Sequence, residues 1–334
     1  MSRVVRFHSL GGPDVLRLEE REVPEPGAGE VLINVEAIGL NRADVMFRTG
    51  RYLEKATFPS QMGFEASGTV LALGSGVEGV RVGDAVGVLP GFDLSKYGTY
   101  ADHAVIPQAH VLPQPQGLTS AQAAGLWMAY LTAYGGLIEA GRLTAGDWVV
   151  ISAASSSVGL AAIQIALQAG ARPIATTLTS VTRDALMEAG AYAVIATQEE
   201  PLGQRLQEYT GGMLNCAFDA VGGPQVVDLA QAMVPKGRIV IHGALSPEDT
   251  PFPLKLALRK SLAFRGYVYT EVTKNIDSLA RAQHFIAQGI ASGMLRPHID
   301  RTFSLDEVVD AHRYLESSQQ FGKVVLTTSP AAHV

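Results

Sequence analysis

GDWVVISAASSSVGLAAIQIA, residues 146–166, is the stretch that decides the fold. A short apolar segment from Trp148 to Ile151 is followed by a run of small residues and then by a long alanine-rich apolar run. This order predicts a strand, a tight turn and a helix. Such a turn brings backbone N–H groups and the positive end of a helix to one point, which suits a pyrophosphate. We interpret the stretch as the first βα unit of a dinucleotide-binding domain.

The phosphate-loop signature in this stretch is incomplete. The usual G-x-G-x-x-G glycines are largely serine and alanine here, and only Gly159 stands where a late glycine is expected. Serine carries a Cβ, which limits positive φ, but its hydroxyl can donate to a phosphate oxygen and cap the helix start. An ordinary buried βα turn is therefore the alternative interpretation.

Length and composition favour two domains and small-molecule partners. The 334 residues, 47% of them hydrophobic, are enough for two cores. The 26 basic and 32 acidic residues give a net charge of −6 without charge runs, so neither a nucleic-acid footprint nor a membrane-binding patch is expected. The first residues lack the apolar core of a signal peptide, and no stretch approaches a membrane span, so we expect a cytoplasmic protein.

The order of predicted elements separates a β part from an alternating part. Residues 3–40 and the Gly- and Pro-punctuated region up to Pro115 predict a twisted, barrel-like β domain. From Thr119, short β runs alternate with helical segments, which is typical of a parallel sheet with helices on both faces. The elements from about Glu271 are expected to pack on the β domain, with the active site in the cleft between the domains.

Ten segments occur together in the order and spacing of one family. They are GEVLINVEAIGLNRAD, MGFEASGTV, VGDAV, GTYADHAVIP, YLTAY, AGDWVVISAASSSVGLAAIQIA, GAYAVI, FDAVGG, KGRIVIHGA and FGKVVL. On these segments the chain resembles, nearly end to end, the medium-chain dehydrogenase/reductase superfamily, in its zinc-free quinone oxidoreductase (zeta-crystallin-like) branch. The resemblance implies an α/β fold in which a doubly wound parallel-sheet (Rossmann) nucleotide domain, residues 124–270, is inserted in a mainly β, GroES-like barrel domain. That substrate domain comprises residues 1–123 plus 271–334.

The residues present do not predict a metal site. Catalytic zinc needs three converging protein ligands. In zinc-dependent relatives a cysteine lies near the position of Asn41, and a His-Glu pair stands where this chain has Phe64-Glu65. The eight histidines show no ligand spacing, and the single cysteine, Cys216, lies in an apolar segment typical of a buried strand. We expect no metal, and no zinc in particular.

The end of the second strand of the nucleotide domain indicates which cofactor binds. An NAD-preferring site usually has an acid there, whereas a 2′-phosphate needs hydroxyls and a cation. The segment 176–183 offers hydroxyls and Arg183, and no acid precedes Asp184. By resemblance Arg183 matches the family's phosphate-binding lysine, while Thr197 replaces a phosphate-stacking tyrosine of one family member. We predict NADPH; a merely solvated Arg183 is the alternative.

The resemblance extends the predicted cofactor site to both domains. Asn41 and Thr132 are expected on the ribose side of the nicotinamide, and Lys323 as a second positive charge. A strand through Tyr267 is expected to line the ring. The complete predicted set is Asn41, Thr132, Ser155, Ser156, Ser157, Val158, Thr177, Thr179, Ser180, Arg183, Gly243, Ala244, Leu245, Tyr267, Val268, Tyr269 and Lys323.

Three residues are candidates for the chemistry: Asn41, Asp44 and Tyr52. Asp44 matches a position that faces the cleft, but a carboxylate that stabilises the first turn of a helix is an equal alternative. The Tyr52 hydroxyl is expected to donate to a developing enolate or quinol oxygen, with a packing role as the alternative. The family's tyrosine two positions beyond the aspartate is Met46 here, so the proton donor does not transfer directly.

These features predict hydride transfer from NADPH to a quinone or an α,β-unsaturated carbonyl compound, without a metal. An enoyl-thioester reductase is an alternative with the same architecture. A non-catalytic, crystallin-like protein that binds NADPH is another. The resemblance also implies a homodimer formed through the sheet edge of the nucleotide domain.

Overall fold

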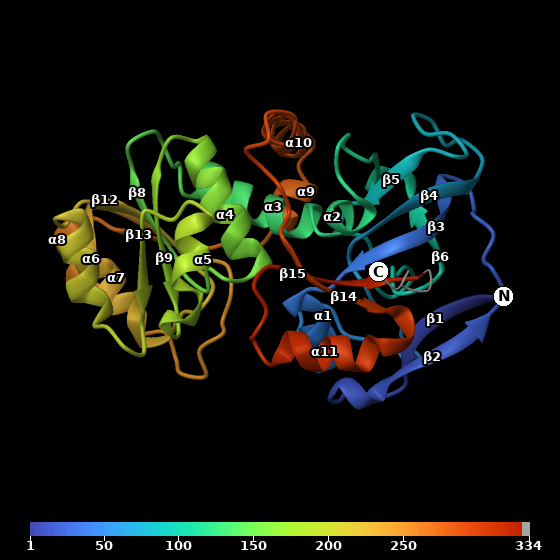
Figure 1. The fold of residues 1–334 in the computed structure, drawn as a ribbon, viewed down its shortest axis with the longest axis horizontal. Coiled ribbons are helices and arrows are strands. Elements are labelled where there is room, and N and C mark those ends of the chain that lie inside the picture. The colour runs from blue at the N-terminus through green and yellow to red at the C-terminus, as the bar shows by residue number, and fades with distance from the viewer. Residues whose placement is uncertain (329–334) are drawn as a thin grey trace. The chain divides into compact units, whose positions relative to one another are not determined.

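The computed structural model describes residues 1–328 and divides the chain into two compact units, each with its own sheets (Figure 1). The β unit comprises Met1–Met128 together with the described residues from Arg296 onward. The parallel-sheet unit comprises Ala129–Leu295. Among the described residues, no helix is both long and apolar enough to cross a membrane.

The β unit contains a hairpin and a seven-stranded sheet. The hairpin pairs β1 (Ser2–Phe7) with β2 (Leu16–Arg21). The sheet runs in the order β14 (Ile299–Ser304), β15 (Lys323–Thr327), β3 (Glu30–Gly39), β4 (Ala66–Leu73), β5 (Ala85–Val88) and β7 (Val111–Pro113), with β6 (His103–Pro107) also paired to β3. The helices of this unit include α1 (Arg42–Arg48), α2 (Ser120–Ala124) and α11 (Val308–Glu316). The barrel-like β domain predicted from the sequence is thus present.

The parallel-sheet unit has six parallel strands in the order β10-β9-β8-β11-β12-β13. This is the doubly wound order, so the predicted fold class is confirmed. The strands are β8 (Trp148–Ile151), β9 (Arg172–Thr177), β10 (Ala193–Ala196), β11 (Leu214–Asp219), β12 (Met233–Ile241) and β13 (Ala263–Gly266). Strand β8 is buried on both faces, as its uninterrupted apolar sequence requires.

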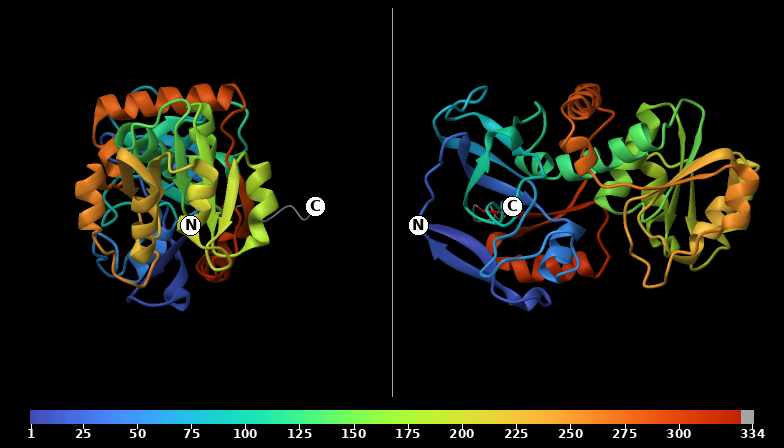
Figure 2. Two further views of the ribbon diagram at one scale, coloured as in Figure 1. Left: turned by 90° about the vertical axis from the view of Figure 1, so that its left-hand side faces the viewer. Right: turned by 180° about the vertical axis from the view of Figure 1, so that it is seen from behind.

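Helices cover both faces of this sheet, with α4 and α5 on one face and α6 and α7 on the other (Figures 1 and 2). Their bounds are α4 (Ser157–Gln168), α5 (Arg183–Glu188), α6 (Leu202–Thr210) and α7 (Val226–Ala232), followed by α8 (Leu254–Lys260), α9 (Thr270–Thr273) and α10 (Ile276–Ala291). Before β8, helix α3 (Trp127–Tyr134) continues into a π-helical turn, Gly135–Ala140. The glycines of that turn permit close packing, because a Cβ on Gly136 would lie 2.2 Å from the Phe218 ring.

The division of the chain differs from the predicted one slightly at its first boundary, which lies after Met128 and not after residue 123, and more at its second. The sequence places everything after residue 270 with the β domain, but α9 and α10 lie within the parallel-sheet unit. Helix α10 is held there because Gln168 of α4 donates to the Phe285 carbonyl at 3.0 Å and the Phe285 ring packs on Tyr134. An apolar stripe shows that a helix face is buried, but not which surface covers it. Elements β14, α11 and β15 do belong to the β unit.

Candidate functional site

The first group of predicted residues lies at the carboxyl edge of the parallel sheet. Because the strands are parallel, the loops that follow β8, β9 and β12 leave the same edge, and ligands of doubly wound folds bind there. The predicted segments Ser155–Ser157, Thr177–Ser180 and Gly243–Leu245 lie in these loops or at their ends. The structure therefore brings three of the predicted segments to one side of one unit.

The β8–α4 turn accepts serine without backbone strain. The residue of this turn with positive φ is Ala153, at 48°, and the serines are not in that region. Ser156 is the N-cap of α4, and its Oγ accepts a hydrogen bond from the Gly159 N–H at 3.1 Å. The Ser156 hydroxyl hydrogen is thus still available for a phosphate oxygen. The first-turn N–H groups of α4 lack helical acceptors, as in any helix, and point to the same place.

Gly159 is required for close packing of the helix start on the turn. A Cβ at this position would lie 2.6 Å from both the Cα and the carbonyl oxygen of Ala154. These are backbone atoms, which cannot move aside as a flexible side chain can. The one glycine that matches the fingerprint therefore has the helix-packing function, and the serines occupy positions that do not need glycine.

Asp219 at the end of β11 organises the neighbouring loops, and no motif in the sequence assigns it this role. Its buried carboxylate accepts hydrogen bonds from the Ser152 hydroxyl at 2.7 Å and from the Val221 and Gly222 N–H groups at 2.9 and 3.0 Å. Its position in FDAVGG, an acid directly after a buried apolar strand, is the signal that identifies it. Asp219 joins the turn after β8 to the loop after β11.

The loop after β12 contains Gly243, Ala244 and Leu245 and lies beside the loop after β11. A Cβ on Gly243 would lie 2.5 Å from the Ala220 carbonyl oxygen, and the Leu245 N–H donates to the same oxygen at 3.2 Å. Ala244 and Leu245 are exposed. The predicted residues here are thus placed at the carboxyl edge with accessible surface.

The loop after β9 carries the residues predicted for a 2′-phosphate. Thr177 ends β9, with its Oγ1 3.5 Å from the Thr182 hydroxyl. Thr179 precedes the short 3₁₀ turn Ser180–Thr182, and Arg183 opens α5. The hydroxyls and the cation therefore belong to one short segment between the end of β9 and the start of α5.

Arg183 has partners that the sequence pattern does not single out. Its guanidinium donates to the Val194 carbonyl at 2.6 Å and to Glu200 Oε2 at 2.6 Å. The Ser180 N–H donates to Glu199 Oε1 at 3.0 Å. Arg183 is therefore neither a free phosphate ligand nor a merely solvated first-turn residue. The adjacency of β9 and β10 in the doubly wound order is the signal that could have placed these acids here.

Glu200 is held by more than Arg183. Its Oε2 accepts the Ala196 N–H at 2.9 Å, and its Oε1 lies 3.0 Å from Arg205 Nε. The Ala196 hydrogen bond, and then the charges of Arg183 and Arg205, lower the pKa of the Glu200 carboxyl. Glu200 is therefore ionised at neutral pH.

The prediction that Tyr267, Val268 and Tyr269 form a strand is wrong. Strand β13 ends at Gly266, and Tyr269 precedes α9. The Tyr267 side chain is buried, and its hydroxyl donates to the Leu131 carbonyl at 3.0 Å. Tyr267 thus packs against α3, whereas Val268 is exposed. Thr132, also on α3, is buried.

In the β unit, Asn41 belongs to a buried polar cluster that we name the Lys323 cluster, consisting of Lys323, Glu65 and Asn41. Lys323 Nζ donates to Asn41 Oδ1 at 2.7 Å and pairs with Glu65 Oε1, to which Asn41 Nδ2 also donates at 3.1 Å. Glu65 Oε2 accepts the Met128 N–H at 2.9 Å. Every charged atom of the cluster therefore has a partner.

The expectation that Lys323 adds a positive charge for the cofactor phosphate is wrong. The side chains of Lys323 and Glu65 are 1% and 0% exposed, and they neutralise each other. A cation that is desolvated and paired in this way does not attract an anion from solvent. The sequence shows the basic residue before an apolar strand but not the acid, 258 positions away, that it contacts.

Asp44 has the contacts of a carboxylate that stabilises the first turn of a helix, which is the alternative to a catalytic role facing the cleft. It is the third residue of α1, and its Oδ2 accepts the Asn41 N–H at 2.8 Å. Its side chain has no exposed surface, which argues against direct contact with a substrate. Burial raises the pKa of Asp44 to about 7, although the Asn41 hydrogen bond and the Lys323 charge both lower it. The carboxyl group is thus poised to titrate near neutral pH.

Tyr52 is half-buried and packs edge-to-face on Phe64, with ring centroids 5.3 Å apart. Both alternatives for Tyr52, packing and donation, therefore remain compatible with its position. Phe64 itself stands where zinc-dependent relatives have a histidine ligand.

The donor set around Asn41 does not fit a zinc ion. Phe64 has no ligand atom, and the oxygen of Asn41 already accepts from the Lys323 ammonium, which would repel a dication. Within residues 1–328, no three His, Cys, Asp or Glu side chains are grouped so that they could hold a metal. Cys216 is buried, and burial raises the pKa of its thiol to about 12.

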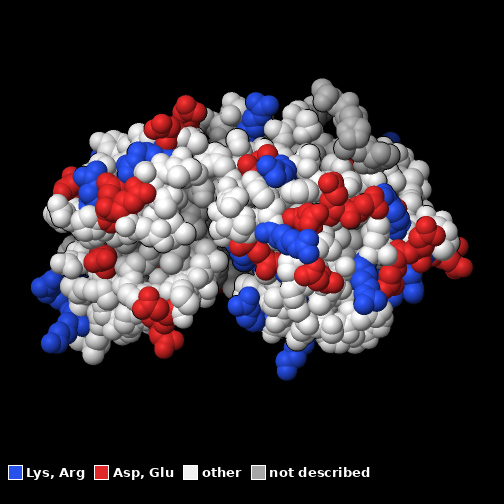
Figure 3. Space-filling model, turned by 60° about the horizontal axis from the view of Figure 1, so that its bottom comes forward, with Lys and Arg blue, Asp and Glu red and all other residues white. Residues whose placement is uncertain are grey.

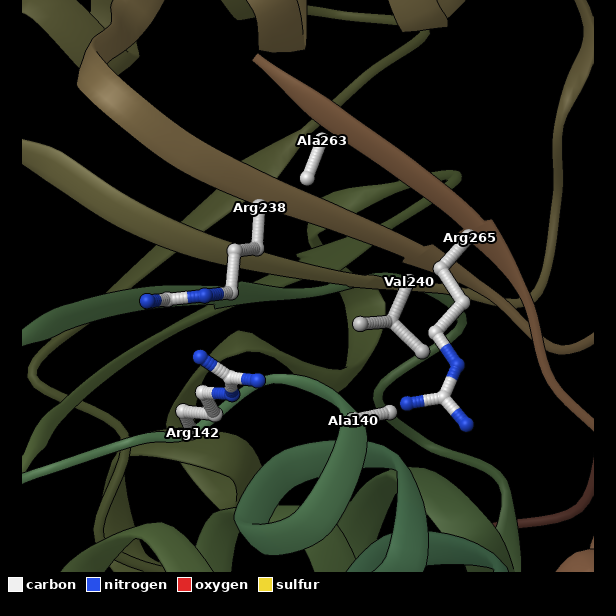
Figure 4. A pocket seen from close by; sticks show the side chains of 6 residues that line it. All are labelled: Ala140, Arg142, Arg238, Val240, Ala263 and Arg265. Carbon is white, nitrogen blue, oxygen red and sulfur yellow. The ribbon is translucent and has the colours of Figure 1, made fainter. Parts of the chain in front are cut away.

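A separate cavity of about 260 Å³ lies in the parallel-sheet unit (Figure 4). It is lined by Ala140, Arg142, Arg238, Val240, Ala263 and Arg265. None of the predicted site residues lines it. Arg238 and Val240 lie within β12, before its carboxyl end.

The surface charges are mixed: acidic and basic side chains alternate over the face shown in Figure 3, without a large field of one sign.

Comparison with known proteins relates the chain to dehydrogenases and reductases. The model of the alcohol dehydrogenase GroES-like domain matches residues 27–116, and that of zinc-binding dehydrogenase matches residues 189–326. Quinone oxidoreductase 1 of Escherichia coli is 30% identical over 98% of this chain and 99% of its own length. The structure of E. coli quinone oxidoreductase complexed with NADPH matches with a TM-score of 0.89 at 29% identity, over 98% of this chain and 100% of that one.

A second solved structure has the same TM-score, but its description names a different nicotinamide nucleotide. It is described as an NAD-dependent alcohol dehydrogenase and matches with a TM-score of 0.89 at 30% identity, again over 98% of this chain and 100% of that one. Relatives of equal similarity therefore differ in the nicotinamide nucleotide that their descriptions name.

Proposed function

Because this chain belongs to the medium-chain dehydrogenase/reductase superfamily and has quinone oxidoreductases among its relatives, we propose that it is an NADPH-dependent oxidoreductase that reduces a quinone or an α,β-unsaturated carbonyl compound. The observation that carries the proposal is the carboxyl edge of the parallel sheet. There an N-capped helix start, a glycine in close packing and accessible loops are combined.

The residues at this edge fit a dinucleotide. The first-turn N–H groups of α4 and the Ser156 hydroxyl would hold the pyrophosphate. Thr177, Thr179, Ser180 and Arg183 would face the adenosine ribose and its 2′-phosphate. Gly243 and Leu245 would border the nicotinamide half, since they follow the strand next to Asp219. When bound, the cofactor supplies the hydride. The protein then needs to bind and orient the cofactor and the substrate, and to exclude water from them.

We propose that the reaction does not use zinc. The support is the donor set: Phe64 offers no ligand atom, and Asn41 is committed to Lys323. Without a metal, negative charge on the reduced carbonyl needs a hydrogen-bond donor. We propose Tyr52 as that donor in the β unit. Asp44 would position Asn41 through the start of α1 instead of touching the substrate.

The activity test combines turnover with binding. Purified protein is mixed with NADPH and a panel of quinones, enones and an enoyl thioester, and NADPH absorbance and fluorescence are followed. Oxidation with quinones or enones supports the proposal, whereas oxidation with the thioester alone favours the enoyl-thioester reductase. A fluorescence change without consumption of NADPH favours the non-catalytic alternative. Neither binding nor oxidation overturns the proposal.

We also propose that the protein acts as a homodimer in the cytoplasm. The edge strand β13 pairs with β12 on one side only, and a second copy could extend the sheet there. Light scattering after size-exclusion chromatography should give twice the mass of the chain. A monomeric mass at micromolar concentration would contradict the dimer.

A further inference from the structure

Two carboxylates occupy the surroundings of the segment proposed to bind the 2′-phosphate. The Glu200 carboxylate accepts a hydrogen bond from the Arg183 guanidinium, and the Glu199 carboxylate accepts one from the Ser180 backbone N–H. Both acids come from the loop between β10 and α6, and that loop is fixed to the end of β9 because the Thr197 N–H donates to the Thr177 carbonyl at 2.8 Å. The phosphate-binding groups and the acids are therefore held together by the sheet.

A 2′-phosphate and a 2′-hydroxyl respond differently to these acids. A phosphate needs the donors of Arg183 and Ser180 and is repelled by nearby carboxylates. A ribose hydroxyl can donate to a carboxylate, as it does in NAD-preferring sites. To bind NADPH, Arg183 must leave Glu200 or be shared with it, while NADH makes no such demand.

Glu200 does not depend on Arg183 for its position. The Ala196 N–H donates to the same oxygen, Oε2, that accepts the Arg183 guanidinium, and Arg205 pairs with the other oxygen, Oε1. The Arg183–Glu200 pair is partly exposed, with side chains 32% and 21% accessible, so the guanidinium can exchange partners at modest cost. The carboxylate would remain in place when the guanidinium turns to a ligand.

We propose that Glu200 is a specificity-determining residue that competes with the 2′-phosphate for Arg183, so that this chain uses NADH as well as NADPH. The inference rests on the proposed dinucleotide site and adds to it the competition between Glu200 and the phosphate. A residue that touches neither the nicotinamide nor the substrate would thus set the choice between nucleotides.

The experiment compares wild type with Glu200→Gln. Glutamine keeps an oxygen for the Ala196 N–H but lacks the charge that holds Arg183. Dissociation constants are measured by fluorescence titration for NADPH and NADH, and by calorimetry for adenosine 2′,5′-bisphosphate and adenosine 5′-monophosphate. The two adenosine fragments isolate the 2′-phosphate from the rest of the cofactor. In wild type, NADH and NADPH should bind within about tenfold of each other.

For Glu200→Gln we expect NADPH and the bisphosphate to bind roughly three- to tenfold more tightly, with NADH and the monophosphate unchanged. Glu208→Gln is the matched control. It removes the same charge from a carboxylate that also pairs with Arg205, but Glu208 is not a partner of Arg183. The control should leave all four affinities unchanged.

Three results would overturn the inference. One is a wild-type preference for NADPH of a hundredfold or more. This result is measured on the wild-type protein alone and does not depend on whether a variant folds. Another is an equal change, or none, for the phosphorylated and unphosphorylated ligands in Glu200→Gln. The third is the same shift in Glu208→Gln. If these occur while wild type binds both nucleotides, the proposed function stands; if wild type binds no nucleotide, the function and the inference both fail.

Discussion

The two units each contain an ion pair near residues that the sequence assigns to the cofactor, and the two pairs differ in burial. Lys323 and Glu65 have essentially no accessible surface, whereas Arg183 and Glu200 are about a third and a fifth exposed. A buried charge that loses its partner cannot recover its hydration, but a partly exposed one can. The buried pair is therefore structural, and the exposed pair is suited to exchange with a ligand.

The largest effect is expected from Lys323→Met in the buried pair. The substitution leaves the Glu65 carboxylate buried without its cation and removes the donor to Asn41 Oδ1. We expect a loss of about 3–5 kcal/mol in the free energy of unfolding, measured by urea denaturation of the whole chain.

Glu208→Gln, which breaks an exposed pair on α6, serves as the control and should leave the free energy of unfolding almost unchanged. If Lys323→Met were as mild as this control, the structural interpretation of the Lys323 cluster would be wrong.

The next effect concerns the pH dependence of stability through Asp44, the carboxyl beside that cluster. Burial raises its folded-state pKa to about 7, above the usual value of 3.8. The folded state therefore binds the proton more tightly than the unfolded state between these pH values. The contribution of Asp44 is fully present below pH 4 and is lost as the pH rises through about 7, by on the order of a few kcal/mol.

Asp44→Asn keeps an acceptor for the Asn41 N–H but does not titrate. The difference between wild-type and variant unfolding free energies, measured from pH 4 to 8, should change steadily over this range. The difference is needed because burial also lowers the pKa of His312 and His242 to about 3, and these histidines destabilise the fold as the pH falls below 6.5. Parallel curves for the two proteins would show that Asp44 does not titrate there.

A smaller effect, confined to the ligand, is expected for Arg183→Ala in the exposed pair. NADPH should bind about tenfold more weakly because a charge-assisted bond to the 2′-phosphate is lost, while NADH should change little. The stability of the protein should fall by no more than about 1 kcal/mol. Fluorescence titrations with both nucleotides check this, and equal weakening of both would refute the assignment of Arg183.

The sequence predicts the fold well because its signals are local. The apolar run before the small residues of 152–157 predicts β8, the turn and α4, and the alternation that follows predicts the parallel sheet. The same stretch does not show that Ala153, and not a serine, takes the positive φ. Nor does it show that a Cβ at Gly159 would collide with the Ala154 backbone.

The errors concern partners that are distant in sequence. Lys323 and Arg183 are both cations near expected ligand positions, and the sequence does not show that Glu65 neutralises one completely and Glu200 the other in part. Tyr267 is part of an apolar segment, and only the structure shows that α3 accepts its hydroxyl. Periodicity likewise predicts that α10 buries one face but not that α4 covers it.

A structure of the protein with NADP⁺ bound tests the central claim most directly. We predict the pyrophosphate at the start of α4, beside Ser156, and the 2′-phosphate in hydrogen-bond contact with Arg183, whose guanidinium has turned from Glu200 while Glu200 still accepts the Ala196 N–H. A nucleotide bound away from the carboxyl edge of the parallel sheet would contradict the account, as would a 2′-phosphate in solvent with Arg183 still on Glu200.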